Sequence, residues 1–392
     1  MSARRKKNDA DSGKLLLGRP GNNLKMGIVG LPNVGKSTLF NTLSKLDVPA
    51  SNFPFCTIDP NKARIPVPDA DWEWLCEKFQ PGSRVPAFLT IFDIAGLVRG
   101  AAEGAGLGNE FLSHIAQVDG IYHVVRVFDD AEVTHVEESV DPVRDLQIIR
   151  EELLAKDVQN VERNLEAALK VRGDKTKKAE AEMLQKILEV LNSGTSIRHA
   201  EWTNKEIEFL NTLFLLTAKP AVVLVNMSER DYLKKRNKHL KKLFEYVQTN
   251  MPDDPIIPFS GMVETTLLQI GEEQAAAWCE SNKASSALDK IVLAGYKRLN
   301  LIHFFTCGAD EVKCWTIREG TKAPGAAGTI HTDMEKGFIC AEVYSIDALR
   351  EHETESGVKA AGKLQQKGKT YVVQDGDIMF MKFNPPKASK KK

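Results

Sequence analysis

Continuous apolar runs recur along the first two thirds of the chain, and most of them lack the polar alternation of a half-exposed strand. Such runs are typical of strands that are buried on both faces of a parallel sheet. Each run is followed by a loop with polar or glycine residues. This order predicts a doubly wound α/β sheet with a binding site at the carboxyl ends of its strands. The runs are residues 25–29, 87–92, 123–128, 221–225 and 256–259.

A helical pattern replaces the strands between Phe128 and Ala221. Apolar residues there recur at intervals of three and four, which places them on one face of a helix. Two such stripes flank a basic stretch at 172–178, so we expect a helical hairpin or short coiled coil inserted into the first domain. Two interpretations stay open: a partner-binding arm, or a packed insert with a solvated tip. The stripes are Leu154, Val158, Val161, Leu165 and Ala168, then Leu184, Ile187, Leu188 and Leu191.

Short β-rich segments punctuated by glycines follow from about residue 302. They predict a small α+β module at the end of the chain. The module shows no sequence pattern of a metal-ligand cluster or a catalytic triad. Its β-rich segments are 313–317, 338–344 and 370–373.

The composition of the chain indicates the class of protein and its compartment, but it does not indicate which partners the protein binds. The 392 residues carry 53 basic and 53 acidic side chains, so whole-chain charge favours no partner. Basic residues gather at 4–7 and 387–392, where they can contact RNA or acidic membrane lipid, or only aid solubility. The six cysteines form no Cys-x-x-Cys pair, and we find no signal peptide and no run of about eighteen apolar residues. We therefore expect a cytosolic protein with reduced thiols and no membrane span, with the nucleus or a membrane surface as secondary locations.

Residues 30–37 read Gly-Leu-Pro-Asn-Val-Gly-Lys-Ser, which is the Gly-x-x-x-x-Gly-Lys-Ser pattern of a phosphate-binding loop. The glycines let backbone N–H groups turn towards phosphate oxygens. Lys36 supplies positive charge to the β- and γ-phosphates, and the Ser37 hydroxyl is a ligand for Mg²⁺. An apolar run precedes the loop and a helix-compatible stretch follows it, as the motif requires. The predicted nucleotide contacts are Gly30, Asn33, Val34, Gly35, Lys36, Ser37 and Thr38.

A second nucleotide motif, Asp93-Ile94-Ala95-Gly96, closes the run 87–92. Asp93 is expected to contact Mg²⁺, and the amide of Gly96 to sense the γ-phosphate. Thr57 lies between the two motifs, where a switch threonine would also bind Mg²⁺; the alternative is an ordinary loop threonine. The glycine-rich segment after Gly96 is expected to order around the γ-phosphate and to relax after hydrolysis.

Leu97 stands where many small GTPases carry a glutamine that orients the attacking water. A leucine side chain has no hydrogen-bonding group, so slow intrinsic hydrolysis is expected unless another group positions the water. One candidate helper is K⁺, because related potassium-activated P-loop enzymes carry an asparagine where Asn33 stands here. The cation would offset charge that develops near the phosphates. The alternative is that Asn33 only caps the loop by bonding to backbone.

The stretch Asn226-Met227-Ser228-Glu229 follows the run 221–225, where GTPases carry Asn-Lys-x-Asp to read guanine. Glu229 replaces the Asp, and Met227 replaces the Lys that packs along the base. Asn226 remains and can meet N7 and N6 of adenine as a bidentate amide. Because loss of a bidentate partner removes about 1–3 kcal/mol of preference, we favour ATP and keep GTP as a second substrate. The other candidate base contacts are Phe128, Ser260, Gly261 and Met262.

These stretches together resemble the YchF, or Obg-like ATPase, family of the translation-factor class of P-loop proteins, over nearly the whole chain. The stretches that carry the resemblance are 30–40, 52–61, 93–108, 226–229 and 316–324, and the long N-terminus and lysine-rich end look eukaryotic. The resemblance implies a doubly wound P-loop domain interrupted by a helical arm, then a β-grasp (TGS) domain. The implied divisions are a basic N-terminus at 1–20, the nucleotide-binding domain at 21–142 and 216–301, the insertion at 143–215, the TGS domain at 302–387 and a basic tail at 388–392.

The same resemblance implies ATP preference, association with the ribosome or ribosomal RNA, a role in translation or stress signalling, and an activating protein as a further partner. It also implies that a histidine substitutes for the missing glutamine, and the matching position is His135. A loop histidine is also compatible with a structural role. Two functions remain open. One is a slow Mg²⁺-dependent ATPase switch with Lys36, Leu97 and His135 at its catalytic centre; the other is a ribosome or RNA adaptor in which nucleotide only sets conformation.

Overall fold

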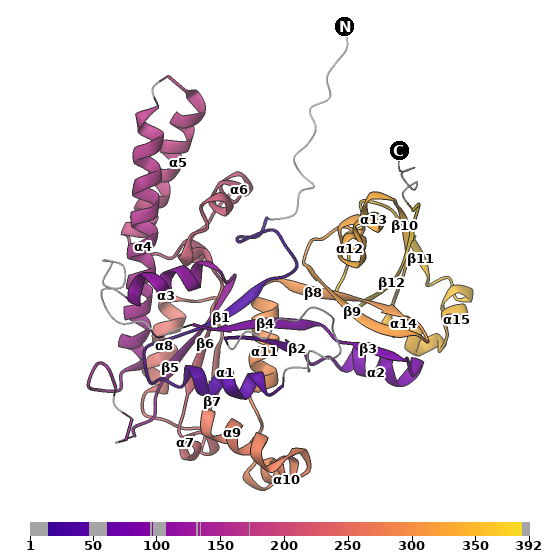
Figure 1. Cartoon of the computed structure of the whole chain (residues 1–392), viewed down its shortest axis with the longest axis horizontal. Helices are drawn as coiled ribbons and strands as arrows, with labels where there is room; N and C mark the ends of the chain where they lie inside the picture. The colour runs from indigo at the N-terminus through magenta and orange to yellow at the C-terminus, as the bar shows by residue number, and fades with distance from the viewer. Residues whose placement is uncertain are drawn as a thin grey trace, which may run out of the picture. The chain divides into compact units, whose positions relative to one another are not determined.

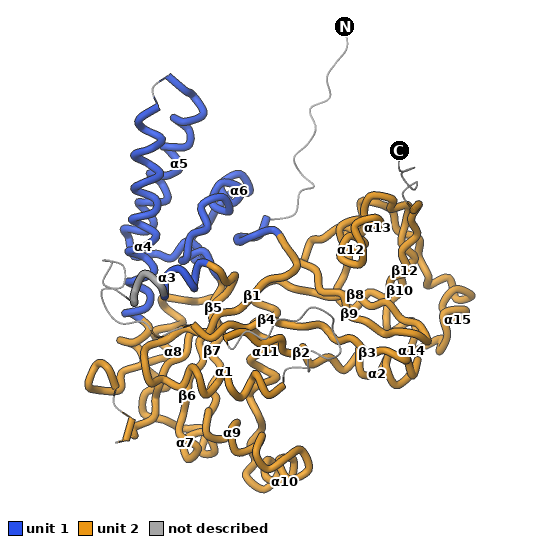
Figure 2. The backbone as a smooth tube through the Cα atoms, in the orientation of Figure 1, with its two compact units in different colours: residues 1–20, 99–116, 147–219 blue, residues 21–98, 117–146, 220–392 orange. Residues whose placement is uncertain are grey.

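The computed structural model describes residues 15–46, 61–94, 96, 107–130, 132–133, 135–171 and 173–385. The chain divides into two compact units (Figure 2). Unit 1 is drawn from the segments 1–20, 99–116 and 147–219, and unit 2 from 21–98, 117–146 and 220–392. One helix, α4 (Pro142–Lys170), begins in unit 2 and continues into unit 1.

Unit 2 contains a six-stranded sheet in the order β2-β4-β1-β5-β6-β7. All neighbouring pairs are parallel except β2 with β4, which is antiparallel. Every residue of β5 and β6 is buried, as expected for continuous apolar runs in a covered sheet. The predicted doubly wound fold is confirmed, and the five apolar runs correspond to five of these strands. The strands are β1 (Lys25–Val29), β2 (Lys62–Pro66), β4 (Phe88–Asp93), β5 (Gly120–Arg126), β6 (Ala221–Asn226) and β7 (Ile256–Phe259).

Among the helices of unit 2, α1 and α11 contact this sheet, whereas α10 packs against α9 (Figure 1). On α8, Leu243 and Val247 are spaced one helical turn apart, and both enter a core with Val125 of β5 and Val223 of β6. A different contact holds α11, because the Tyr122 hydroxyl of β5 donates a hydrogen bond of 2.7 Å to the Ile291 carbonyl. The helices are α1 (Lys36–Ser44), α7 (Glu229–Leu233), α8 (Leu240–Asn250), α9 (Gly261–Ile270), α10 (Glu272–Asn282) and α11 (Leu288–Arg298).

A second six-stranded sheet in unit 2 has the order β11-β10-β12-β8-β9-β3. Its edge strand β3 comes from early in the chain and pairs in parallel with β9, with Ser83 opposite Glu311. The neighbouring helix α2 is tied to β8, because Asp69 at its N-cap lies 2.6 Å from the His303 ring. The strands are β3 (Ser83–Val85), β8 (Leu301–Cys307), β9 (Glu311–Arg318), β10 (Phe338–Ser345), β11 (Gln365–Lys367) and β12 (Asp377–Phe383). The helices are α2 (Ala70–Phe79), α12 (Ala323–Ile330), α13 (Thr332–Lys336), α14 (Ile346–His352) and α15 (Glu355–Ala360).

The expected β segment at 370–373 was wrong. It forms only an isolated bridge between Val372 and Lys322. Its backbone bonds to the loop before α12: the Val373 amide donates to the Thr321 carbonyl and the Ala323 amide to the Tyr371 carbonyl. The strand of this region is β12, which begins at Asp377 and pairs with β10 and β8.

Unit 1 is helical, and its hairpin of α4 and α5 agrees with the two predicted stripes (Figure 2). Asp157 of α4 is buried and accepts hydrogen bonds of 2.7–2.8 Å from the Leu216 amide, the Thr217 amide and the Thr217 hydroxyl. This carboxylate fixes the turn η3 (Leu216–Ala218). The other elements are α3 (Leu107–Ala116), α5 (Lys175–Asn192), η2 (Ile197–His199) and α6 (Asn204–Leu213). The buried core residues are Val161, Ala168, Ala181, Leu184, Ile187, Leu191, Ile197, Leu210 and Leu215.

Among the described residues, no helix has the length and apolarity that crossing a membrane requires.

Candidate nucleotide-binding site

The predicted phosphate loop connects β1 to α1 at the carboxyl edge of the first sheet. Gly35 has a φ of 99°, in the region that favours glycine, and it precedes the first residue of α1. Gly30 also cannot carry a side chain, because a Cβ there would lie 2.5 Å from the Val124 carbonyl oxygen. No side chain of the described residues caps the N-terminus of α1. Its amide groups are therefore available to an anion.

Lys36 is held beside this loop, and no carboxylate of the described residues is bonded to it. Its Nζ donates to the Leu31 carbonyl at 2.8 Å. Burial lowers the pKa of Lys36 to about 8, and the negative charge of Asp93 opposes this shift. A Cβ at Gly96 would lie 3.0 Å from the same Nζ, so the backbone at Gly96 approaches the ammonium closely. A phosphate that replaced the Leu31 carbonyl would supply the charge that Lys36 lacks.

Ser37 and Asp93, two of the predicted Mg²⁺ ligands, lie within hydrogen-bonding distance of each other. The Ser37 hydroxyl donates to Asp93 Oδ2 at 3.2 Å. Asp93 Oδ1 is buried and has no hydrogen-bond partner among the described residues, and burial raises the pKa of this carboxyl. Unused carboxylate and hydroxyl oxygens fit a hard cation such as Mg²⁺. Thr57, the third predicted ligand, lies outside the described residues, as does Leu97.

Asn226, at the end of β6, braces the phosphate loop from inside. Its amide Nδ2 donates to the Val34 carbonyl at 2.9 Å, and its Oδ1 accepts from the Gly261 amide at 3.1 Å. Because Gly35 has no Cβ, Nδ2 can lie close to the loop; a Cβ there would be 2.2 Å away. One amide hydrogen and one lone pair of Asn226 remain. Its reading of adenine stays a prediction beside this bracing role.

The other predicted base contacts differ in exposure. Met227 is enclosed in the core with Val127 and Leu243, so its side chain does not present an open face. Ser260 is buried and caps α9, whereas Met262 is 63% exposed on the first turn of the same helix. Thr38 is exposed, and its methyl would lie 3.1 Å from a Cβ at Gly261. The structure thus brings the phosphate loop, Asn226 and Gly261 together and places Met262 at the surface.

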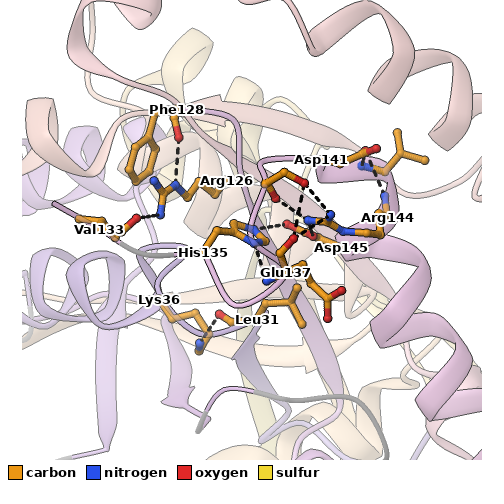
Figure 3. A network of polar contacts seen from close by, with 12 residues as sticks. Leu31, Lys36, Arg126, Phe128, Val133, His135, Glu137, Asp141, Arg144 and Asp145 are labelled. Carbon is orange, nitrogen blue, oxygen red and sulfur yellow. Dashed lines mark hydrogen bonds and ion pairs between the residues drawn. The ribbon is translucent and has the colours of Figure 1, made fainter. Parts of the chain in front are cut away.

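Arg126 was missed by the sequence analysis and organises the loop that contains Phe128. Its guanidinium is buried and donates to the carbonyls of Phe128 and Val133, both at 2.9 Å. The same group lies 4.4 Å from the centre of the Phe128 ring, which is half-buried (Figure 3). A charged residue inside the apolar run 123–128 was the signal that could have identified it.

His135 lies beyond this loop and is bonded at both ring nitrogens (Figure 3). Its Nε2 is 2.9 Å from Asp145 Oδ2, and its Nδ1 accepts from the Glu137 amide at 3.1 Å. The His135 side chain is 3% exposed. Asp145 was not predicted; an acidic residue in the first turn of a helix also reads as an ordinary helix-terminus preference.

Comparisons with known proteins extend over nearly the whole chain. One family model, described as "50S ribosome-binding GTPase", matches residues 25–158, and another, described as "Protein of unknown function (DUF933)", matches residues 301–384. Proteins named "Obg-like ATPase 1" are 55% identical over 389 residues in Oryza sativa subsp. japonica, covering 98% of each chain, and 51% identical over 393 residues in Xenopus laevis, covering 99% of each. The solved "Structure of the Schizosaccharomyces pombe YchF GTPase" is 51% identical with a TM-score of 0.88, covering 94% of this chain and 100% of the other.

Proposed function

The chain belongs to the Obg-like ATPase (YchF) family of P-loop nucleotide hydrolases, and we propose that it hydrolyses ATP slowly as a Mg²⁺-dependent molecular switch, with GTP as a weaker second substrate. The proposal rests on the nucleotide site of unit 2. The phosphate loop, Lys36 and the Ser37–Asp93 pair supply what any nucleoside triphosphate needs. The choice of base has to come from other residues, among them those at the end of β6 and directly after it.

The observation that supports the ATP preference is the identity and placement of the residues at the two guanine-reading positions, 227 and 229. Met227 is enclosed in the core, and Glu229 is exposed at the start of α7. Neither the lysine that packs along guanine nor the aspartate that accepts from it is present. A site without that bidentate acceptor loses about 1–3 kcal/mol of preference for guanine. The remaining amide of Asn226 suits adenine as well as guanine.

The residues then divide the chemistry of hydrolysis. Lys36 and the amides at the start of α1 bind and orient the phosphates. Ser37 and Asp93 would hold Mg²⁺, which neutralises charge on the β- and γ-phosphates when bound. His135 is the candidate to orient the attacking water in place of Leu97, and Asn33, exposed in the loop with a φ of 62°, is the candidate to hold K⁺.

A competition titration tests the choice of base. The chain is loaded with a fluorescent ADP analogue and Mg²⁺, and ATP and GTP are used to displace it. We expect ATP to compete at least several-fold more strongly, and Glu229→Asp to shift the ratio towards GTP. Tighter binding of GTP by the parent chain would contradict the proposal. Met227→Lys is unsuitable here, because it would place an ammonium in the core.

A second element of the proposal is association with the ribosome or ribosomal RNA in the cytosol, in a role in translation or stress signalling. One observation favours it beside the description of the family model at 25–158. At the tip of the hairpin Leu169 and Val171 are 58% and 48% exposed, next to Lys175 and Lys178. A basic surface with apolar side chains suits a structured polyanion.

Cosedimentation with ribosomes in a sucrose gradient tests this association. Lys175→Glu with Lys178→Glu should remove the chain from the ribosomal fractions, while Glu166→Lys, an exposed change on α4, should not. Binding that ignores the tip charges would contradict the proposed surface. A hydrolysis-deficient variant that still restores function in cells would favour the adaptor over the switch.

A further inference from the structure

The starting observation is that His135 has no ring nitrogen left for a water molecule. Because Nδ1 accepts from the Glu137 amide, the proton of the neutral ring lies on Nε2. That proton is donated to the Asp145 carboxylate, 2.9 Å away. A group that orients a water for attack needs an open lone pair or an open N–H. The ring as placed offers neither.

Asp145 is itself held firmly. It is 1% exposed, and its second oxygen accepts from the Arg144 guanidinium at 3.2 Å. Arg144 also donates to the Ser139 hydroxyl at 2.9 Å and to the Glu137 carbonyl at 3.3 Å. Residues 135–141 and the first turn of α4 therefore form one bonded structure, which Figure 3 shows around the His135 ring.

The position of Asp145 on α4 links the Asp145–His135 bond to movements of that helix. Asp145 lies in the first turn of α4, whose amides at Val143 and Arg144 are capped by Asp141. The same helix continues without interruption to Lys170 at the hairpin tip. A movement of this first turn has to act on the Asp145–His135 bond.

We propose that Asp145 is a positioning residue that holds His135 in an unreactive place, and that hydrolysis requires this bond to open. The proposal rests on the proposed function, in which His135 orients the attacking water. Opening the bond frees Nε2. Val133, two residues before His135, is bonded to Arg126 at the carboxyl end of β5, and β5 lies between the phosphate-loop strand β1 and the Asn226 strand β6. Because α4 carries Asp145, a partner bound to the hairpin gains a direct means of raising the rate.

A purely structural role for the pair predicts the opposite result. In that case the Asp145–His135 bond only stabilises the loop, and its loss lowers or leaves unchanged the rate of hydrolysis. The direction of the effect therefore separates the two roles. If a rise in the rate of hydrolysis requires His135, the Asp145–His135 bond restrains that ring specifically. If the rise does not require His135, the substitution has only loosened the site in general.

Steady-state ATP turnover with Mg²⁺ and K⁺ provides the test. Asp145→Asn keeps the shape but weakens the charge-assisted bond, and Asp145→Ala removes it. We expect kcat to rise about threefold for Asn and about tenfold for Ala, with KM unchanged, because a larger fraction of the chain has a free ring. Combining either change with His135→Ala should abolish the gain. Lys242→Ala is the matched control, since it breaks an exposed contact to Asp141 at the same helix start without touching His135.

Two outcomes of these assays overturn the proposal. One is an unchanged or lower kcat in a folded Asp145 variant, and the other is a gain that survives His135→Ala. If the parent chain hydrolyses neither ATP nor GTP, the proposed function fails instead, and the two failures are thereby distinguished.

A measurement on the parent chain covers the case in which the Asp145 variants do not fold. Long-range ¹⁵N–¹H spectra of the histidine rings report the tautomer and bonding of each imidazole, and His135 is assigned by its loss in His135→Ala. Without nucleotide we expect the Nε2–H tautomer with a protected proton. Saturation with Mg²⁺ and a non-hydrolysable ATP analogue should accelerate the exchange of that proton with water, because a minority of the chains then has the ring free. An exchange rate that does not change at saturation overturns the proposal.

Discussion

Two carboxylates, the buried Asp157 in unit 1 and the half-buried Asp93 in unit 2, use their oxygens in opposite ways. Asp157 in unit 1 accepts three hydrogen bonds, all from the turn that it fixes. Asp93 in unit 2 accepts one from Ser37 and leaves Oδ1 without a partner among the described residues. A carboxylate whose bonds are complete stabilises a fold, whereas one that is partly used is ready for a ligand. The difference separates the scaffold of unit 1 from the site of unit 2.

Asp145 lies between these extremes. Both of its oxygens are used, but one of its partners is the ring that the proposed reaction needs. In the proposed mechanism the fully bonded Asp145 belongs to a resting state, and its bond to His135 has to open before hydrolysis. Burial also raises the pKa of the Asp145 carboxyl. The three carboxylates therefore differ in whether the group bonded to each of them also takes part in the proposed reaction.

The largest effect is expected at Lys36. Lys36→Ala removes a charge that faces the phosphates, so nucleotide affinity or turnover should fall about a hundredfold or more. The unfolding midpoint should stay the same, because within the described part of the chain the ammonium bonds to the Leu31 carbonyl alone. Calorimetric ATP titration and thermal unfolding measure the two quantities, with Lys45→Ala, an exposed change just past α1, as the control. Unchanged affinity in a folded variant would remove the phosphate-loop assignment.

Asp157→Asn should show the reverse pattern. The new amide group directs N–H at backbone donors, and each unsatisfied buried donor costs about 1–3 kcal/mol. Hydrogen exchange at the Leu216 and Thr217 amides should accelerate accordingly, while ATP affinity stays the same. Glu166→Gln, exposed on the same helix, is the control and should change neither. Weaker ATP binding by Asp157→Asn would contradict the assignment of Asp157 to the scaffold of unit 1 and not to the nucleotide site.

The pH dependence of unit 1 sharpens the same contrast. Burial raises the pKa of Asp157 to about 6, above its ordinary value of 3.8. The folded state then binds this proton more tightly than the unfolded state, so the contribution of Asp157 to stability increases as pH falls through 6. Between pH 7 and pH 5 the parent should gain about 1 kcal/mol relative to Asp157→Asn, measured by exchange at the Leu216 amide. A relative loss over this interval would contradict the assignment.

The smallest expected effect concerns Asn33 and a monovalent cation. ATP turnover by the parent should be a few-fold faster in KCl than in NaCl of equal concentration, because K⁺ near the phosphates offsets developing charge. Asn33→Ala should reduce this ratio towards one. Equal rates of the parent in both salts would exclude a K⁺ requirement. A ratio that survives the substitution would place the cation away from Asn33.

Much of the fold was predictable because its signals are local. Continuous burial of β5 and β6 produces unbroken apolar runs, and the faces of α4 and α5 produce stripes. The strand β3 has only three residues, and its partner lies more than two hundred positions away, so no local pattern marks it. The segment 370–373 has the composition of a strand but is held by a loop instead, since tertiary contacts override propensity.

The residues of the candidate site likewise fall into those that the sequence could predict and those that it could not. Lys36 and Ser37 were predictable because the phosphate loop is one contiguous motif. Met227 was expected beside the base, yet the direction of its side chain follows from the packing of α8, which the sequence pattern does not reveal. The His135–Asp145 bond requires the chain to fold back from the helix start, ten residues later, and neither residue type demands it.

The pairing of β3 with β9 has a consequence for the order of events during synthesis. Ser83 and Glu311 are 228 positions apart, so at about 5–20 residues per second the edge strand waits roughly ten to fifty seconds for its partner. During that interval β3 lacks the strand with which it pairs, and α2 lacks β8 and β9, which it later contacts. A nascent chain arrested before residue 300 should therefore expose α2 and β3 to protease or chaperone, and completion of the 392-residue chain should end that exposure.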